Sequence, residues 1–244
     1  MATAPQPPAA LDCRVNEVTL MGEDVYRVRL DPVEGELPAF AAGQYLALEL
    51  PGEEPAWFSI ASAPGEAHLT LHIQVAGASD TAAQIIDHLR QERQVRVNMP
   101  FGEACLTAPP SQPLLLVVAG TGFAQAKSVV EFLMAQPASP PVFLYWGVRR
   151  HEDMYLRTLA DQWQQRWPDF HFRPVVGDDA DHGWTGHHDH LVRALKADGH
   201  RLGEVQVLAS GSPAMVYSVM DTLVDAGLPQ SHFLSDVLQY APRG

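Results

Sequence analysis

The tripeptide Gly120-Thr121-Gly122 lies between an apolar run and an amphipathic segment, an arrangement suited to binding phosphate. Residues 114–118 are unbroken and apolar, which predicts a parallel strand covered on both faces. Over residues 123–133 the apolar side chains recur at helical spacing. A strand that turns through glycines into a helix N-terminus presents backbone N–H groups and the positive end of the helix dipole to a ligand. Because this pattern also occurs in many ordinary strand–helix turns, the tripeptide alone does not decide between binding and structure.

The composition limits the classes of partner. The 244 residues carry a formal charge of −13, which argues against nucleic acid and anionic membranes as general partners. Two cysteines, Cys13 and Cys105, are too few for a disulfide scaffold or a four-thiolate cluster, so we expect free thiols. The opening residues MATAPQPPAA lack a basic region and an apolar core, so we expect no signal peptide and a cytoplasmic protein.

The first half of the chain has the period-two alternation of β-strands. Strands are predicted over residues 14–20, 25–30, 44–50, 56–61, 68–75 and 94–99, with one helix over residues 79–90. Six short antiparallel strands fit a small barrel better than an open sheet, because closure removes exposed edges. We therefore predict a tail over residues 1–11, a six-stranded antiparallel barrel domain over residues 12–106 and a Pro-rich linker over residues 107–113.

The second half alternates between strands and helices. Further strands are predicted over residues 142–146, 172–176, 205–209 and 233–238, and helices over residues 153–167, 191–197 (after Asp189 as N-cap) and 213–226. This order predicts an α/β domain over residues 114–244 with a doubly wound parallel sheet. Ligands of such sheets bind beyond the carboxyl ends of the strands, which directs attention to residues 120–123, 147–150, 177–179 and 210–215 and to the C-terminal segment.

The common NAD fingerprint is not complete in this segment. A third glycine would be expected where Gln125 stands, and an acidic residue would be expected where the second strand runs into Arg149 and Arg150. These arginines could hold a 2′-phosphate or the pyrophosphate, or they could be solvated loop charges.

The order of motifs across both halves resembles the ferredoxin-NADP reductase superfamily, and most closely its NAD(P)H:flavin oxidoreductase branch. The likeness covers residues 12–236. The segments that carry it are Val25-Tyr26-Arg27-Val28-Arg29-Leu30, Ala42-Gly43-Gln44-Tyr45-Leu46, Phe58-Ser59-Ile60-Ala61-Ser62, Gly77-Ala78-Ser79, Pro100-Phe101-Gly102-Glu103-Ala104, Ala119-Gly120-Thr121-Gly122-Phe123 and Tyr145-Trp146-Gly147.

The resemblance implies a flavin site on the barrel. In the family's Arg-x-(Tyr/Phe)-Ser motif, the aromatic residue flanks the flavin ring, the Ser hydroxyl hydrogen-bonds near N5 and the Arg binds flavin phosphate. These first two roles would fall to Phe58 and Ser59, although a barrel-core aromatic and an outward hydroxyl are the plainer alternatives. Further flavin-binding positions implied in the same way are Ile60, Ala61, Ser62, Gly77 and Ser79. The Arg position is Ala56, which favours a flavin held through its ring and exchanging as a substrate.

The resemblance also implies a nicotinamide dinucleotide site on the α/β domain. The implied cofactor-binding positions are Gly120, Thr121, Gly122, Phe123, Arg149, Gly211, Pro213 and Met215. Ser210 stands where many members of the family carry a Cys near the nicotinamide. Asp236 resembles an acidic position of the C-terminal segment, so Ser59 and Asp236 are the two expected catalytic residues, although a solvated carboxylate is an equal alternative for Asp236.

The function implied is hydride transfer from NADH or NADPH to an exchangeable FMN, FAD or riboflavin. Two alternatives stay open: a reductase that retains FAD and passes electrons to a protein such as an oxygenase, and a scaffold that has lost flavin binding. No metal is expected, because the histidines in residues 182–190 follow glycines in a stretch typical of a solvated turn.

Overall fold

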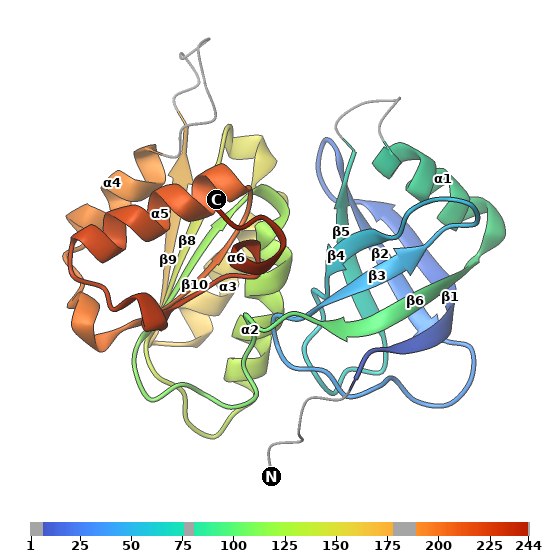
Figure 1. Cartoon of the computed structure of the whole chain (residues 1–244), viewed down its shortest axis with the longest axis horizontal. Helices are drawn as coiled ribbons and strands as arrows, with labels where there is room; N and C mark the ends of the chain where they lie inside the picture. Colours follow the sequence, from blue (N-terminus) through green and yellow to red (C-terminus); the bar gives the residue numbers. More distant parts are fainter. Residues whose placement is uncertain (1–6, 76–80, 178–188, 244) are drawn as a thin grey trace. The chain divides into compact units, whose positions relative to one another are not determined.

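The computed structural model of the chain describes residues 7–75, 81–177 and 189–243 (Figure 1). The chain forms two compact units. The barrel unit comprises the chain up to Ala108 together with Lys127–Ala135, and the sheet unit comprises Pro109–Ala126 with the chain from Gln136 onward. Gly77, Ser79 and the histidines at positions 182, 187 and 188 lie outside the described residues.

The barrel unit contains one antiparallel sheet of six strands in the order β4-β3-β6-β1-β2-β5. Its elements are β1 (Ala9–Leu20), β2 (Val25–Pro32), β3 (Tyr45–Glu49), β4 (Ala56–Ser59), β5 (Leu69–Gln74), α1 (Thr81–Glu92) and β6 (Gln94–Phe101). Just beyond β4, the Ala61 N–H donates to the Thr70 carbonyl of β5 over 2.7 Å. This bond links β4 and β5, the two strands at opposite ends of the sheet order, and so closes the sheet towards a barrel. The predicted six-stranded antiparallel barrel is thus confirmed in its strand number and pairing.

The interior of the barrel follows from the alternation of each strand. Inward-facing aliphatic side chains form one cluster that α1 covers with Ile85, Ile86 and Leu89. The expectation of a structureless tail through residue 11 is wrong for its last three residues, because β1 begins at Ala9. There Ala9, Ala10 and Leu11 pair with β6, and such backbone pairing does not require an alternating sequence.

The sheet unit contains five parallel strands in the order β11-β10-β7-β8-β9. Its strands are β7 (Leu114–Ala119), β8 (Val142–Val148), β9 (Phe170–Val176), β10 (Gln206–Ser210) and β11 (Phe233–Leu234). Its helices are α3 (Arg157–Arg166), α4 (Asp189–Ala197), α5 (Pro213–Asp225) and α6 (Val237–Tyr240), and α2 (Phe123–Met134) starts here and continues into the barrel unit. Short 3₁₀ turns are η1 (Gly120–Gly122), η2 (His151–Asp153), η3 (Leu202–Glu204) and η4 (Gln230–His232).

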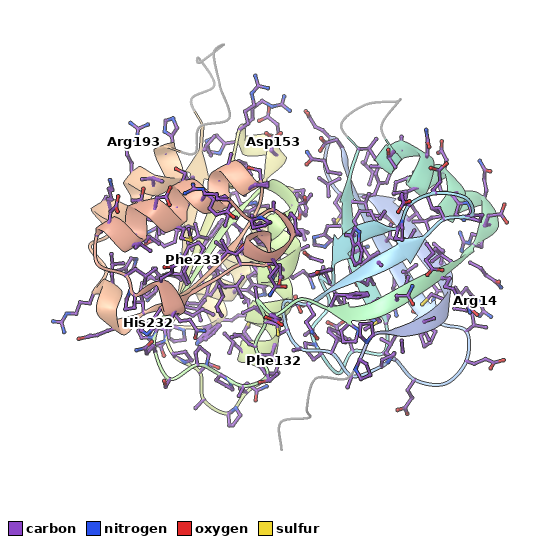
Figure 2. All side chains as sticks on the ribbon, in the orientation of Figure 1. Arg14, Phe132, Asp153, Arg193, His232 and Phe233 are labelled. Atoms are coloured by element: carbon purple, nitrogen blue, oxygen red, sulfur yellow. The ribbon has the colours of Figure 1, made fainter. Side chains whose placement is uncertain are left out.

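Helices cover both faces of this parallel sheet, as two neighbouring residues of β8 show. Tyr145 packs in the cluster formed with α4 and α5, which pass in front of the strands in Figure 1. Trp146 points to the opposite face, where its ring lies near Phe123 of α2 and Tyr155. Phe233, labelled in Figure 2, is buried in the same cluster as Tyr145. The predicted doubly wound sheet is confirmed.

The end of the chain departs from its predicted structure. A strand was expected over residues 233–238, but β11 has two residues and the chain turns at Ser235 and Asp236 into α6. A short apolar run does not by itself distinguish strand from helix. No helix in the described ranges has both the length and the apolar character that crossing a membrane would require.

Candidate functional site

The glycine turn at the end of β7 is open on the side where a ligand would approach. After Ala119 the chain forms the turn Gly120–Gly122 and then α2. Gly120 has a φ of +53°, which disfavours residues with a Cβ, and no atom lies within 4 Å of the position that its Cβ would occupy. The Phe123 N–H that opens α2 donates to the carbonyls of Gly120 and Thr121, so the first N–H groups of this continuous turn and helix are those of the glycine turn itself, where an anionic group can bind.

Gly122 is required for a different reason, which is close packing against β10. A Cβ on Gly122 would lie 2.3 Å from the backbone oxygen of Ser210. Since a backbone atom cannot move aside as a side chain can, only glycine allows this approach. The turn and the end of β10 are therefore held together by contact between main chains.

An aromatic cluster supports the glycine turn from within the sheet unit. The Trp146 indole N–H donates to the Gly120 carbonyl over 3.0 Å. The ring of Phe123 stacks on Trp146 with 3.9 Å between centroids and also stacks near Trp163. Phe123 has no exposed surface, so a dinucleotide contact at this predicted position would come from its backbone and not from its ring. The ring instead packs beneath the turn.

The turn after β10 lies against the same glycines. Ser212 caps α5, and its hydroxyl accepts from the Met215 N–H over 3.3 Å. Met215 is fully buried, and its methyl carbon would lie 2.5 Å from a Cβ on Gly211. Pro213 is exposed in the first turn of α5. Gly211 and Pro213 thus remain available to a ligand, whereas Met215 supports them from below.

The predicted catalytic carboxylate, Asp236, is reached by the residue that replaces the third glycine of the fingerprint. Gln125 is buried in α2, and its amide donates to the Asp236 carboxylate over 3.5 Å. Asp236 is partly exposed and precedes α6. Tyr240 follows one turn later, where partial desolvation of its hydroxyl and the charge of Asp236 raise the pKa of the phenol.

The two arginines after β8 have different environments. Arg150 forms ion pairs with Glu152 at 3.3 Å and Asp153 at 3.0 Å, and its own N–H donates to Asp153. Arg149 is exposed, and no ion pair engages it among the described residues. Arg149 is therefore the residue of this pair that could bind a phosphate group.

In the barrel unit, the side chains of β4 alternate between the core and the outer face. Phe58 is partly buried and packs against the barrel core together with Ala56. Ser59 is half-buried at the end of the strand, opposite Tyr45, and its hydroxyl has no hydrogen-bond partner among the described residues. A half-buried hydroxyl without a partner is suited to hydrogen-bonding a ligand.

The three residues after Ser59 are buried and form hydrogen bonds within the barrel unit. A flavin contact at the predicted positions Ile60, Ala61 and Ser62 would therefore come from their backbone groups. The Ile60 N–H donates to the Gln44 carbonyl over 3.0 Å, and the Ser62 hydroxyl accepts from the Thr70 N–H over 3.1 Å. These bonds fix the direction in which β4 ends and hence the position of Ser59.

Helix α2 contributes two polar side chains that the sequence analysis did not identify. The Lys127 ammonium donates to the Ala61 carbonyl over 3.2 Å, and the Ser128 hydroxyl donates to the Ser62 carbonyl over 2.8 Å. Lys127 also pairs with Glu131 at 2.6 Å, and burial raises the pKa of Glu131. On β5, burial lowers the pKa of His72 to about 3, and the nearby charge of Lys127 acts in the same direction.

Gln44 is another positioning residue that the sequence analysis did not single out. Its side chain accepts from the Ala41 N–H over 2.7 Å and donates to the Gly102 carbonyl over 3.0 Å. It thereby joins the segment before β3 to the turn after β6. Gln44 follows Gly43, which has a φ of +101° and approaches the Ala104 carbonyl closely. In the sequence, this glycine is the feature that could have drawn attention to Gln44.

Comparison with protein families identifies the second half of the chain. Residues 116–221 match the family model described as the oxidoreductase NAD-binding domain. The chain is 33% identical over 233 residues to terephthalate 1,2-dioxygenase reductase component 2 of Comamonas sp., covering 95% of this chain and 69% of that protein. It is 29% identical over 208 residues to an NAD(P)H-flavin reductase of Aliivibrio fischeri, covering 82% of this chain and 86% of that protein.

Solved structures extend the likeness over both units. A cytochrome P450 reductase of Amycolatopsis superposes with a TM-score of 0.79 at 25% identity, covering 95% of this chain and 70% of that one. A ferredoxin-NADP⁺ reductase of Plasmodium falciparum superposes with a TM-score of 0.76, covering 92% of this chain and 95% of that one. Because its identity is only 14%, the second comparison supports the fold alone.

Proposed function

Because the chain belongs to the ferredoxin-NADP reductase superfamily, we propose that it is an NAD(P)H:flavin oxidoreductase acting on an exchangeable flavin. The oxidoreductase class follows from its relatives, which are flavin reductases and reductase components. The observation that supports a flavin substrate is Ser59, whose half-buried hydroxyl has no partner among the described residues. That the flavin exchanges is supported by Ala56, which stands where the family's motif has a phosphate-binding Arg.

The residues fit the two ligands in different ways. For the dinucleotide, the open side of Gly120 and the N-terminus of α2 offer backbone N–H groups, and the exposed Arg149 offers a cation. For the flavin, Ser59 offers a hydroxyl, on a strand that Phe58 anchors against the barrel core. The flavin phosphate would have no charge-assisted contact from position 56, which favours binding through the ring.

The chemistry that the bound cofactors would supply is hydride transfer from nicotinamide C4 to flavin N5. Ser59 would donate a hydrogen bond at N5, and Phe58, which packs against the barrel core, would hold β4 and thereby the position of Ser59. Gln125 would hold the Asp236 carboxylate, a contact whose 3.5 Å length leaves room for it to tighten. No side chain needs to act as a nucleophile, since positioning of two rings accounts for the rate.

A second candidate function is a reductase that retains its flavin and passes electrons to a protein. The 33% identity with a dioxygenase reductase component over 95% of the chain favours it. Ala56 counts against it, because tight retention of FMN or FAD benefits from a cation at the phosphate.

The test is NADH and NADPH oxidation by the purified protein, with and without added riboflavin, FMN or FAD. We expect oxidation to depend on added flavin and the protein to be colourless after purification. A yellow protein that oxidises NAD(P)H without added flavin would support the second candidate. No consumption and no binding of either cofactor would support a scaffold without catalysis.

A further inference from the structure

Three aromatic rings form an exposed surface on the outer face of β4, β3 and β6, which are labelled side by side in Figure 1. Tyr45 and Phe101 stack with 5.9 Å between centroids, and Trp57 stands nearly perpendicular to both at 5.7 Å and 5.1 Å. Trp57 is 55% exposed although it lies in the middle of a strand. We refer to these three residues as the Trp57 surface.

The barrel core does not explain this surface. Along β4, Ala56 and Phe58 face the core, so Trp57 faces outward by the alternation of the strand. An exposed Trp beside two partly buried aromatic rings is uncommon on a free surface, whereas Trp and Tyr are enriched where one protein binds another.

The charges around the Trp57 surface have one dominant sign. Glu53 and Glu54 are exposed in the connection from β3 to β4, and Glu103 is exposed two residues after Phe101. On the same outer face, Arg96 pairs with Asp12 at 3.2 Å. The sequence of the barrel unit contains 16 acidic residues and 7 Lys or Arg. A partner for this surface should therefore carry Lys or Arg around an apolar centre.

The Trp57 surface is continuous with the flavin motif. Ser59 lies two residues after Trp57, on the same face of β4, and stands directly opposite Tyr45 in the sheet register. A partner bound to Trp57 would thus contact the strand that bears the hydroxyl proposed to bond N5. A short distance between a bound partner and the flavin would serve a partner that exchanges electrons with the flavin.

We propose that the Trp57 surface docks a protein electron acceptor with a basic rim and an apolar centre. The inference rests on the proposed function, because it requires a flavin beside Ser59, and it adds that the reduced flavin passes its electrons to the partner before it dissociates. One NAD(P)H would reduce two molecules of a one-electron acceptor and release NAD(P)⁺ and one proton. The adenine of a dinucleotide could also stack on Trp57, but its phosphates would meet the charges of Glu53 and Glu54.

The experiment compares three acceptors in the presence of NADH and a fixed low concentration of riboflavin. Cytochrome c, a lysine-rich protein, is the docking probe, and ferricyanide is the small anionic acceptor. Riboflavin reduction without either acceptor gives the basal activity. Superoxide dismutase is present in all assays. We expect Trp57→Ala to lower kcat/KM for cytochrome c about tenfold, as for a central interface Trp. The double variant E53Q/E54Q should lower it about threefold at low salt and not at high salt.

The matched control is Leu20→Ala, which removes another exposed apolar side chain of the barrel unit (48% exposed) and should change nothing. Thermal melting should be unchanged in all variants because the substituted side chains are exposed. Equal cytochrome c rates in wild type and W57A would overturn the proposal, as would equal losses for all three acceptors. A raised KM for FAD alone would assign the surface to adenine instead. Absence of any flavin-dependent oxidation by wild type would contradict the proposed function and the inference that rests on it, whereas equal cytochrome c rates with an active wild type would contradict the docking surface alone.

Discussion

In the sheet unit, the proposed dinucleotide contacts come from the backbone: the open side of Gly120, the start of α2 and the close approach of Gly122 to Ser210. In the barrel unit, the proposed flavin contact is the side chain of Ser59, on a strand that Phe58 anchors against the core. Backbone geometry demands glycine at fixed positions, whereas a side-chain contact can disappear with one substitution and leave the strand unchanged, as Ala56 illustrates. The two sites should therefore respond differently to mutation.

The largest effect is expected for Gly122→Ala in the sheet unit. The new Cβ would lie 2.3 Å from the Ser210 oxygen, so the turn or the end of β10 must shift. We expect kcat/KM for NAD(P)H to fall more than about 100-fold, because misplaced backbone donors lose several contacts together. Steady-state kinetics at saturating riboflavin measure this.

The control for that variant is Gly203→Ala, since no atom lies within 4 Å of the Cβ position there. This substitution should leave the kinetics unchanged. Wild-type kcat/KM in G122A would mean that the turn is not the dinucleotide site.

The next effect, in the barrel unit, is expected for Ser59→Ala. Loss of one hydrogen bond that acts in the transition state should lower kcat about 10- to 30-fold and leave the riboflavin Kd within about twofold. Ser59→Thr keeps the hydroxyl and should retain most of the activity. If S59A weakened riboflavin binding as much as turnover, the hydroxyl would serve binding instead.

A smaller effect is expected when the missing cation is restored by Ala56→Arg. Because Ala56 is only partly buried, the longer Arg side chain should extend its guanidinium to solvent and lower the Kd for FMN about tenfold through a charge-assisted phosphate contact, while the Kd for riboflavin, which has no phosphate, stays unchanged. Ala56→Gln is the uncharged control. Equal tightening for both flavins would show that charge at position 56 does not explain the weak retention.

The smallest effect concerns the stability of the barrel unit through His72. The folded pKa of about 3 lies below the ordinary value of 6.5, so the unfolded chain binds the proton more readily and stability falls as the pH drops from 6.5 towards 3. Between pH 7 and 5.5 this should cost about 1 kcal/mol. Urea unfolding of His72→Gln over the same range should lack that loss, and an identical pH dependence in both proteins would contradict it.

The same contrast explains what could be predicted from the sequence. The strand periods and the glycine pattern predicted both sheets, because alternation and turn geometry are local properties. Lys127, Ser128 and Gln44 were not identified, since their partners Ala61, Ser62 and Gly102 lie far away in sequence. Phe123 and Met215 remain predicted positions of the dinucleotide site, but the sequence could not show that their side chains are buried, because a residue that supports a loop and a residue that touches its ligand carry the same local pattern.

The measurement that tests the central claim most directly is anaerobic mixing of NADH with the protein and riboflavin, followed by flavin absorbance. The account predicts that one NADH bleaches one riboflavin, that the rate saturates with both, and that the deuterium of [4-²H]NADH slows the step. Riboflavin that stays oxidised in the presence of protein and excess NADH, with NADPH giving the same result, would contradict the account.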